Sequence, residues 1–142
     1  MLVRLLFASR AADATPAADA VASICAKASE HNAANGVTGV LVYGSGIFMQ
    51  AIEGSRRAVS DLYALILRDQ RHRDVTLLHY EEISERRFGG WTMGIVDTAR
   101  LNPALLLKYG EKAELDPYAI SGKASLALLD ELLASACVTS AP

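Results

Sequence analysis

Four short stretches of the chain combine residue types that suit ligand binding as well as packing. They hold a histidine and asparagines before a glycine, a glutamine among apolar residues, an acid between basic residues, and the only tryptophan beside a glycine pair. In chain order they read HNAANGVTG (31–39), FMQAIEG (48–54), RDQRH (68–72) and FGGWTMG (88–94). Amide, carboxylate, guanidinium and imidazole groups in such positions could hold the polar edge of a flat ligand.

The glutamine of the second stretch is expected to face the interior. Strand alternation places Phe48, Gln50 and Ile52 on one face of a strand. The intervening Met49 and Ala51 lie on the other. Because a buried amide needs hydrogen-bond partners, we expect Gln50 to be held by a polar network or by the polar edge of a ligand.

Each of the other polar groups, taken alone, has a plain structural explanation. Asparagine is common at helix C-termini, which would account for Asn32 or Asn35. Charges at a helix end, such as Asp69 and Arg71, are usually solvated. A phenyl ring in a short apolar run, as at Phe7, is usually a core residue. The ligand hypothesis therefore depends on the four stretches together.

We do not expect this chain to be an enzyme. The candidate acid–base pairs are His31 with Glu53 and His72 with Asp69. Neither pair has a serine or cysteine at a position suited to a nucleophile, so catalysis has little support.

The flanking patterns predict two helices and five strands. One helix is expected from Thr15 as N-cap, with Pro16 in its first turn, to about 32–36, and the other over 56–69. Both carry apolar residues at helical spacing on their inner faces. The strands are expected at LVRLLFA (2–8), VTGVLVYG (37–44), GIFMQAIEG (46–54), DVTLLHYEEI (74–83) and GWTMGIVD (90–97). A tight hairpin is expected across 44–46.

This order, β-α-β-β-α-β-β, is the ferredoxin-like pattern of an α+β sandwich with one extra strand. It predicts a five-stranded sheet with two helices side by side on one face. The groove between those helices is a natural place for a flat ligand.

The character of the chain changes after Asp97. LNPALLLKYG (101–110) and KASLALLDELLASA (123–136) read as apolar helical segments with more leucine than a solvated helix tolerates. We therefore predict a binding domain over 1–97 and a helical extension over 98–142. The extension is expected to pack on the outer face of the sheet or on another subunit. We expect a homo-oligomer, and a separate downstream protein partner because no effector enzyme follows.

Composition excludes several classes of partner. Of the 142 residues 51% are hydrophobic, enough to close one core. A net charge of −2 and a pI near 5.9 leave no basic excess for a nucleic acid. No apolar run approaches the roughly 20 residues of a membrane span and no signal peptide is visible, so we expect a cytosolic protein. Cys25 and Cys137 fit no metal-ligand spacing and are expected to be reduced thiols.

The four stretches together resemble the BLUF family, the blue-light sensor domains that use flavin. SRA (9–11), HNAANGVTGVLVYGSGIFMQAIEG (31–54), LYALILRDQRH (62–72) and RRFGGWTMG (86–94) occur in family order and at family spacing. The resemblance covers residues 2 to about 97.

The resemblance implies that FAD lies between the two helices. Ile24 and Ile66 match the aliphatic pair that sandwiches the flavin ring, in a dry, flat slot. Asn32 matches the residue whose amide meets the C4 carbonyl and N3 side of the ring. Phe48 and Gln50 are expected to face the flavin from their strand.

Four further residues match family positions around the pocket. Asp69 and Arg71 correspond to the residues that bind the polar ring edge and the ribityl or phosphate part, where a guanidinium fork suits a carbonyl or phosphate. His31 and His72 correspond to positions at the rim.

The signalling residues implied by the resemblance include one departure. In family members a tyrosine stands two residues before the motif serine, here Ser9, and its hydroxyl bonds the glutamine that contacts the flavin. In this chain that position is Phe7. Trp91 and Met93 match the residues that exchange places near the glutamine, here Gln50.

Phe7 predicts an impaired or altered photocycle. In the family, light moves an electron and a proton from the tyrosine, after which the glutamine changes its hydrogen bonding. Phenylalanine has no proton to give and is a far poorer reductant, whereas Trp91 could donate an electron without completing the switch. The substitution fits two histories equally: one made to study the dark state, or a natural member whose photochemistry has been lost or rerouted.

The alternative is a flavin-free protein-interaction module on the same fold, since fold alone does not fix function. Phe7 and Gln50 would then be simple core residues. A yellow preparation with a flavin spectrum distinguishes the two hypotheses.

Overall fold

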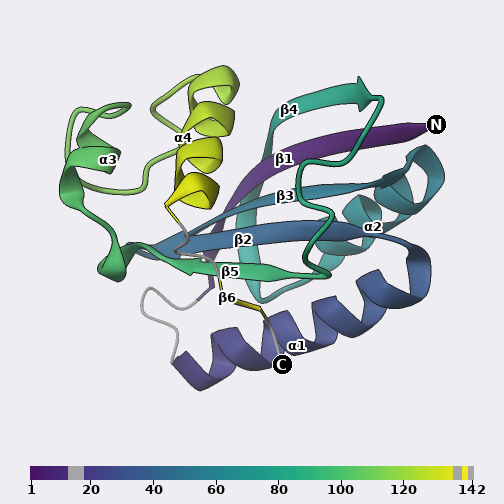
Figure 1. The fold of residues 1–142 in the computed structure, drawn as a ribbon. Helices are drawn as coiled ribbons and strands as arrows, with labels where there is room; N and C mark the ends of the chain where they lie inside the picture. The colour runs from purple at the N-terminus through teal and green to yellow at the C-terminus, as the bar shows by residue number, and fades with distance from the viewer. Residues whose placement is uncertain (13–17, 136–138, 141–142) are drawn as a thin grey trace.

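A mixed β-sheet runs through the centre of the molecule (Figure 1). The structure is a computed structural model and describes residues 1–12, 18–135 and 139–140. Within these residues the sheet has six strands in the order β4-β1-β3-β2-β5-β6. Among the described strands, only β2 and β5 pair in parallel. The strands are β1 (Leu2–Ala11), β2 (Thr38–Gly44), β3 (Ile47–Ser55), β4 (His72–Ile83), β5 (Gly94–Asp97) and the two-residue β6 (Thr139–Ser140).

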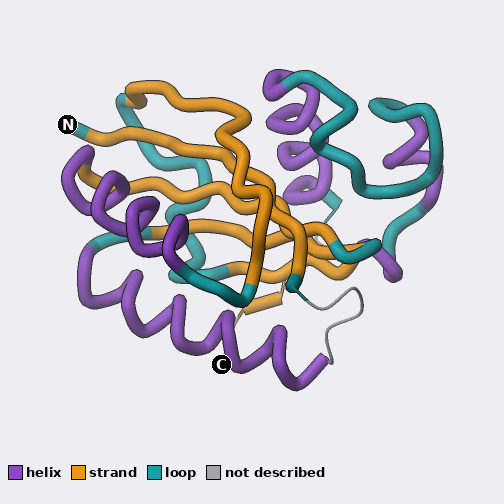
Figure 2. The backbone as a smooth tube through the Cα atoms, turned by 180° about the vertical axis from the view of Figure 1, so that it is seen from behind, coloured by secondary structure: helices purple, strands orange, loops and turns teal. Residues whose placement is uncertain are grey.

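Helices cover both faces of this sheet. The helices α1 (Ala18–Asn35) and α2 (Arg56–Arg68) lie on one face, and α4 (Gly122–Ala134) lies on the other with α3 (Pro103–Leu107) beside it (Figures 1 and 2). A single 3-10 turn, η1 (Thr98–Arg100), leads from β5 toward α3. None of the helices in the described residues is long and apolar enough to cross a membrane.

The predicted ferredoxin-like order is confirmed, with differences at the element ends. Strand β1 continues to Ala11 instead of ending at residue 8, because its later residues still pair with β3 and β4. Strand β5 begins at Gly94 instead of 90, since residues 84–93 form a loop anchored elsewhere. The short β6 adds a sixth strand. The predicted N-cap at Thr15 and Pro16 lies outside the described residues.

Local sequence signals explain two of the element boundaries. The side chain of Ser55 accepts a hydrogen bond from the amide of Ala58 at 3.1 Å and so caps α2. The β2–β3 turn passes through Ser45 and Gly46 with φ of 55° and 75°. Glycine adopts this left-handed region without steric cost, which supports the tight hairpin predicted from the sequence.

Each face of the sheet has its own hydrophobic core. On the face of α2, the side chains of Phe7 and Ile52 pack with Val59. On the opposite face, Leu6 from β1 packs with leucines of the C-terminal helices. The buried members from that extension are Leu101, Leu106, Leu115, Leu128, Leu129 and Leu132. The leucine-rich segments therefore pack on the outer face of the sheet, the first of the two arrangements expected.

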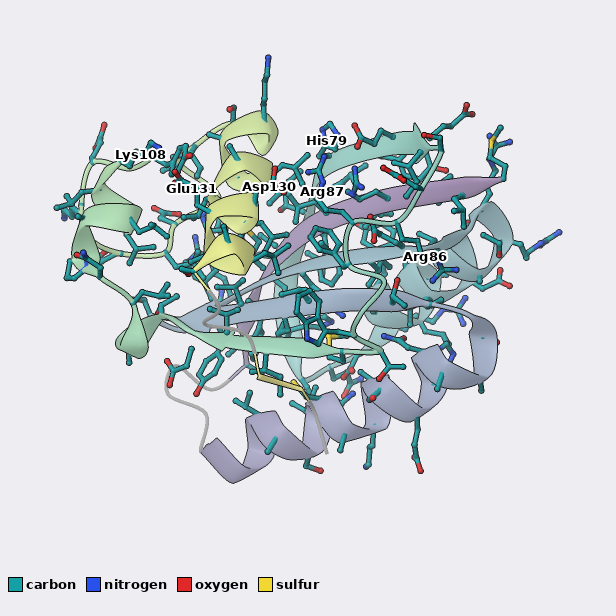
Figure 3. All side chains as sticks on the ribbon, viewed as in Figure 1. His79, Arg86, Arg87, Lys108, Asp130 and Glu131 are labelled. Carbon is teal, nitrogen blue, oxygen red and sulfur yellow. The ribbon has the colours of Figure 1, made fainter. Side chains whose placement is uncertain are left out.

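Two ion pairs connect α4 to neighbouring segments (Figure 3). Arg87, in the loop between β4 and β5, pairs with Asp130 at 2.9 Å. Lys108, which follows α3, pairs with Glu131 at 2.5 Å. Partly exposed ion pairs of this kind contribute little stability, so the packed leucines hold the extension in place.

Replacing Leu129 should test whether the extension shares the core of the sheet. We expect Leu129→Ala to lower the free energy of unfolding by about 2–5 kcal/mol, because it leaves a cavity in a fully packed cluster. The matched control is Leu107→Ala, whose side chain is 52% exposed and whose loss should cost less than about 0.5 kcal/mol. Urea unfolding followed by circular dichroism measures both. Equal effects would contradict a shared core.

Candidate functional site

A cavity of about 220 Å³ opens between α1 and α2 on the sheet face that these helices cover. Both helices present residues at i, i+3, i+4 and i+7 to it, the spacing of one helical face. The strands contribute its floor. The lining residues are Ile24, Cys25, Lys27, Ala28, His31 and Asn32 from α1, Leu62, Leu65, Ile66 and Asp69 from α2 and its C-cap, Ser9, Leu41, Phe48 and Gln50 from the strands, and Arg71, His72 and Met93.

Both isoleucines expected to sandwich a flat ring, Ile24 and Ile66, line this cavity. The sequence analysis did not assign Lys27, Leu62 or Leu65 to the site. The helical spacing from Ile24 to His31, and from Leu62 to Asp69, carries the signal that could have found them.

Asn32, at the end of α1, is fully buried, and only one of its two polar side-chain atoms has a hydrogen-bond partner among the described residues. Its Nδ2 donates to the carbonyl oxygen of Thr92 at 2.7 Å. Its Oδ1 is buried without a hydrogen-bond partner among the described residues, as is Nδ1 of the neighbouring His31. Leaving such an atom unpaired costs about 1–3 kcal/mol, which a ligand donor in the cavity would remove.

Gln50 lies on β3 and faces the cavity beside Phe48, as strand alternation predicts. Its Nε2 donates to Sδ of Met93 at 3.9 Å. A thioether sulfur is a weak acceptor, so this contact holds the amide loosely. No stronger hydrogen bond of the carboxamide is found among the described residues.

A charged pair lies at the mouth of the cavity. Arg71 donates from Nε to Asp69 Oδ1 at 2.9 Å and from Nη2 to Oδ2 at 2.5 Å. The hydrogen bonds from Arg71 hold the pKa of Asp69 below its usual value, and the same contacts raise the pKa of Arg71. With the exposed Lys27, two cations and one carboxylate surround the opening.

His72 joins two elements at the cavity wall. Its Nε2 lies 2.7 Å from the carbonyl oxygen of Ile66, and its Nδ1 lies 2.9 Å from the hydroxyl of Ser9. A carbonyl only accepts, so Nε2 carries the hydrogen, and in the neutral ring Nδ1 accepts from Ser9. The imidazole thus fixes the end of α2 to strand β1.

Two of the residues assigned to signalling do not line the cavity. Phe7 is buried beside it, with its ring centroid 5.6 Å from that of Tyr63 on α2. Trp91 packs against the core on the opposite face of the sheet, whereas Met93 lines the cavity. The loop sends these two side chains to opposite faces of the sheet, so Met93 lies in the cavity and Trp91 lies outside it.

The acid–base pairs considered from sequence are not formed. Glu53 lies on the opposite face of the sheet from His31, where it accepts from Arg4 Nε at 2.8 Å and from the amide of Phe88 at 2.6 Å. His72 bonds Ser9 and Ile66 and not Asp69. Strand alternation places Glu53 on the face opposite His31, and the contacts of His72 with Ser9 and Ile66 occupy both of its ring nitrogens.

Comparisons with known proteins identify the family of the chain. The BLUF family model, described as sensors of blue-light using FAD, matches residues 2–94. A photoactivated adenylate cyclase subunit alpha of Euglena gracilis is 40% identical over 88 residues, which is 62% of this chain. That alignment covers 8% of the relative, so the chain matches only a small part of the cyclase.

Solved structures with similar folds include two small proteins and one larger one. The photo-activated state of BlsA has a TM-score of 0.84 at 31% identity, covering 94% of this chain and 95% of that one. BlrB, a BLUF protein in its dark state, has a TM-score of 0.77 at 36% identity, covering 94% and 96%. A bacterial light-regulated adenylyl cyclase has a TM-score of 0.70 at 26% identity, covering 95% of this chain and 34% of that one.

Cys25 offers a test of the dry cavity wall. Burial raises the pKa of its thiol to about 11 from an ordinary value of 9.0. In a Cys137→Ser variant we therefore expect alkylation by iodoacetamide at pH 8 to be about 100-fold slower in the folded protein than in urea, because the thiolate is the reacting form. The rate in the folded protein should keep rising as the pH increases toward 11. Equal rates in both states would show that the thiol is exposed.

Proposed function

This chain belongs to the BLUF family of sensors of blue light using FAD, and from that premise we propose that the cavity between α1 and α2 holds the flavin ring. The protein is thus an FAD-binding blue-light photoreceptor domain, and the assignment of particular residues to the cofactor is our proposal. We propose further that Phe7 changes its response to light.

The observation that carries the site assignment is the unpaired Oδ1 of Asn32. A buried carbonyl oxygen at the wall of an apolar cavity calls for a donor, and the N3–H group on the polar edge of a flavin ring is a donor of that kind. The Nδ2 bond to Thr92 fixes the orientation of the amide. A flavin-free interaction module gives no reason for this unsatisfied atom.

The walls and the mouth of the cavity support the same assignment. Ile24 and Ile66 would cover the two faces of the ring. At about 220 Å³ the cavity is smaller than the roughly 300–1,000 Å³ of common ligand pockets. It therefore suits the ring end of FAD, with the remainder at the opening, where Lys27 and Arg71 would meet its phosphates and Asp69 and His31 its polar groups.

FAD, when bound, supplies the absorption of blue light. The residues of this chain would then position it and respond: Gln50 offers a loosely held carboxamide, Met93 its sulfur, and Ser9 holds His72 at the wall. A hydrogen bond to a neighbouring hydroxyl would hold Gln50 in its reoriented position.

Phe7 provides no hydroxyl for that hydrogen bond. It lies opposite Gln50 in the register of β1 and β3 and is fully buried among apolar side chains. A phenyl ring can neither donate a proton nor hold a rotated amide by a hydrogen bond. Trp91, packed on the other face of the sheet, lies outside the cavity. We therefore propose that illumination produces no long-lived red-shifted state in this chain.

The wider role of the protein follows from the sensor function. We propose that residues 1–97 form the flavin-binding unit, that 98–142 form its helical extension, and that the chain itself catalyses no reaction. The output would pass in the cytosol to a separate protein partner or to a second copy of the chain. Exposed Leu65, Leu67 and Leu107 are available for such contacts.

Asn32 provides the test of cofactor binding. We expect Asn32→Ala to weaken FAD binding at least about tenfold, because it removes both the acceptor for the ring and the bond to Thr92. Asn35→Ala is the matched control, since the exposed Asn35 side chain bonds only the helix carbonyl of His31 at 2.7 Å among its contacts here. Quenching of flavin fluorescence during titration measures affinity, and thermal unfolding of the apoproteins checks folding. Equal affinity of the two variants would contradict the assignment.

Phe7→Tyr tests the photochemical proposal. The FAD-loaded protein should show no lasting red shift of its flavin absorption after blue light, whereas Phe7→Tyr should show one, because the hydroxyl is restored beside Gln50. Tyr63→Phe, in the same aromatic pair, is the control and should leave the response of each background unchanged. A stable red shift in the unsubstituted chain would show that Phe7 does not prevent the switch.

A further inference from the structure

The β1 and β4 strands connect the cavity to the helical extension at one end of the sheet. They are neighbours in the sheet, and β4 is its edge strand (Figure 1). Ser9 of β1 and His72 of β4 line the cavity and bond each other at 2.9 Å. The residues just beyond them, Arg10 and Asp74, form an ion pair at 3.4 Å. The Ser9–His72 hydrogen bond and the Arg10–Asp74 ion pair therefore lie within two residues of each other along both strands.

The second pair is covered by a residue of the extension. The guanidinium of Arg10 lies 4.3 Å from the centre of the Tyr118 ring, within the range of a cation–π contact. The Tyr118 hydroxyl donates to the backbone carbonyl of Asp74 at 2.9 Å. Since the Arg10–Asp74 pair is partly exposed and weak by itself, the contacts of Tyr118 with both residues are what hold them together.

The backbone of Asp74 has a conformation that needs such support. Its φ is 54°, in the left-handed region that residues other than glycine visit seldom, although aspartate tolerates it better than most. The carbonyl oxygen of this residue accepts from both Tyr118 and the hydroxyl of Thr76, the latter at 3.0 Å. These bonds fix the bend that lets His72 face the cavity while Asp74 meets the extension.

The segment of the extension that begins at Tyr118 contacts β4 at a second point. Four residues after Tyr118, Gly122 begins α4 against the backbone of Leu78, where a Cβ atom would lie only 1.9 Å from the Leu78 carbonyl oxygen. Tyr118 and Gly122 thus attach the start of α4 to the edge strand at both ends of a five-residue segment. A shift of β4 near His72 would be transmitted to α4 through these contacts.

We propose that Tyr118 is a positioning residue that couples occupancy of the flavin cavity to the packing of α4, through the joint formed by Arg10, Asp74 and Tyr118. The inference rests on the proposed function, because it takes FAD as the occupant. Ligand contacts with His72 and its neighbours stabilise one arrangement of the joint, and the joint in turn stabilises the wall of the cavity. Such coupling is reciprocal, so FAD binding should change the packing of α4, and a change at Tyr118 should change the affinity for FAD.

Amide hydrogen exchange of the full chain, with and without FAD, tests the joint. We expect FAD to slow exchange in peptides covering 116–125 about fivefold in the unsubstituted protein. In Tyr118→Phe that difference should vanish, and FAD should bind about fivefold more weakly. Tyr109→Phe, another tyrosine of the extension, is the matched control and should keep both values. A merely structural tyrosine would change the exchange of both forms without abolishing the difference between them.

The outcomes separate this inference from the proposed function. Failure of FAD to bind the unsubstituted chain would overturn the flavin assignment. Binding of FAD with no change in exchange over 116–125 would overturn the joint alone, as would a Tyr118→Phe protein that retains the full difference. If Tyr118→Phe does not fold, Arg10→Gln, which keeps the tyrosine hydroxyl bond, should reduce the difference.

Discussion

The buried carboxylate of Glu53 fixes the loop that closes the cavity. It accepts from Arg4 and from the backbone amides of Arg87 and Phe88, on the sheet face opposite the cavity. Breaking such a buried pair by removing one partner costs about 3–5 kcal/mol. The loop that it anchors brings the Thr92 carbonyl to Asn32 at its other end. The geometry of the cavity thus depends on an ion pair on the other face of the sheet.

The sheet makes this dependence possible because both of its faces are covered. On β3, Gln50 faces the cavity, while the neighbouring Met49 and Ala51 pack in the core beneath the C-terminal helices. A residue that faces the cavity is therefore the direct chain neighbour of a residue in the core on the other face. The same holds at the edge, where Ser9 faces the cavity and Arg10 meets Tyr118. Dense packing on both faces favours transmission of small shifts over their absorption.

The polar site combines firm and loose contacts. Asn32 is held by one strong bond and keeps one atom free for a ligand, and His72 is held at both nitrogens. Gln50, in contrast, bonds only weakly to a sulfur. In the proposed flavin site, the firmly held groups would define where the cofactor lies, and the loosely held amide would respond to a change in it. Phe7 lies opposite that amide in the strand register, without a hydroxyl to hold it.

The sequence by itself determined the element order, the inward faces of α1 and α2, and most of the cavity lining. The element order and the inward faces follow from local periodicity, as at Ile24 and Gln50, whereas the polar lining residues such as Asn32 and Asp69 were expected from the resemblance to the family. Tertiary structure decided the rest: that Trp91 packs on the far face while Met93 enters the cavity, that Glu53 anchors a loop instead of pairing with His31, and that Tyr118 reaches Asp74. Contacts between residues far apart in the chain leave no periodic signal, because only the folded sheet brings their partners together.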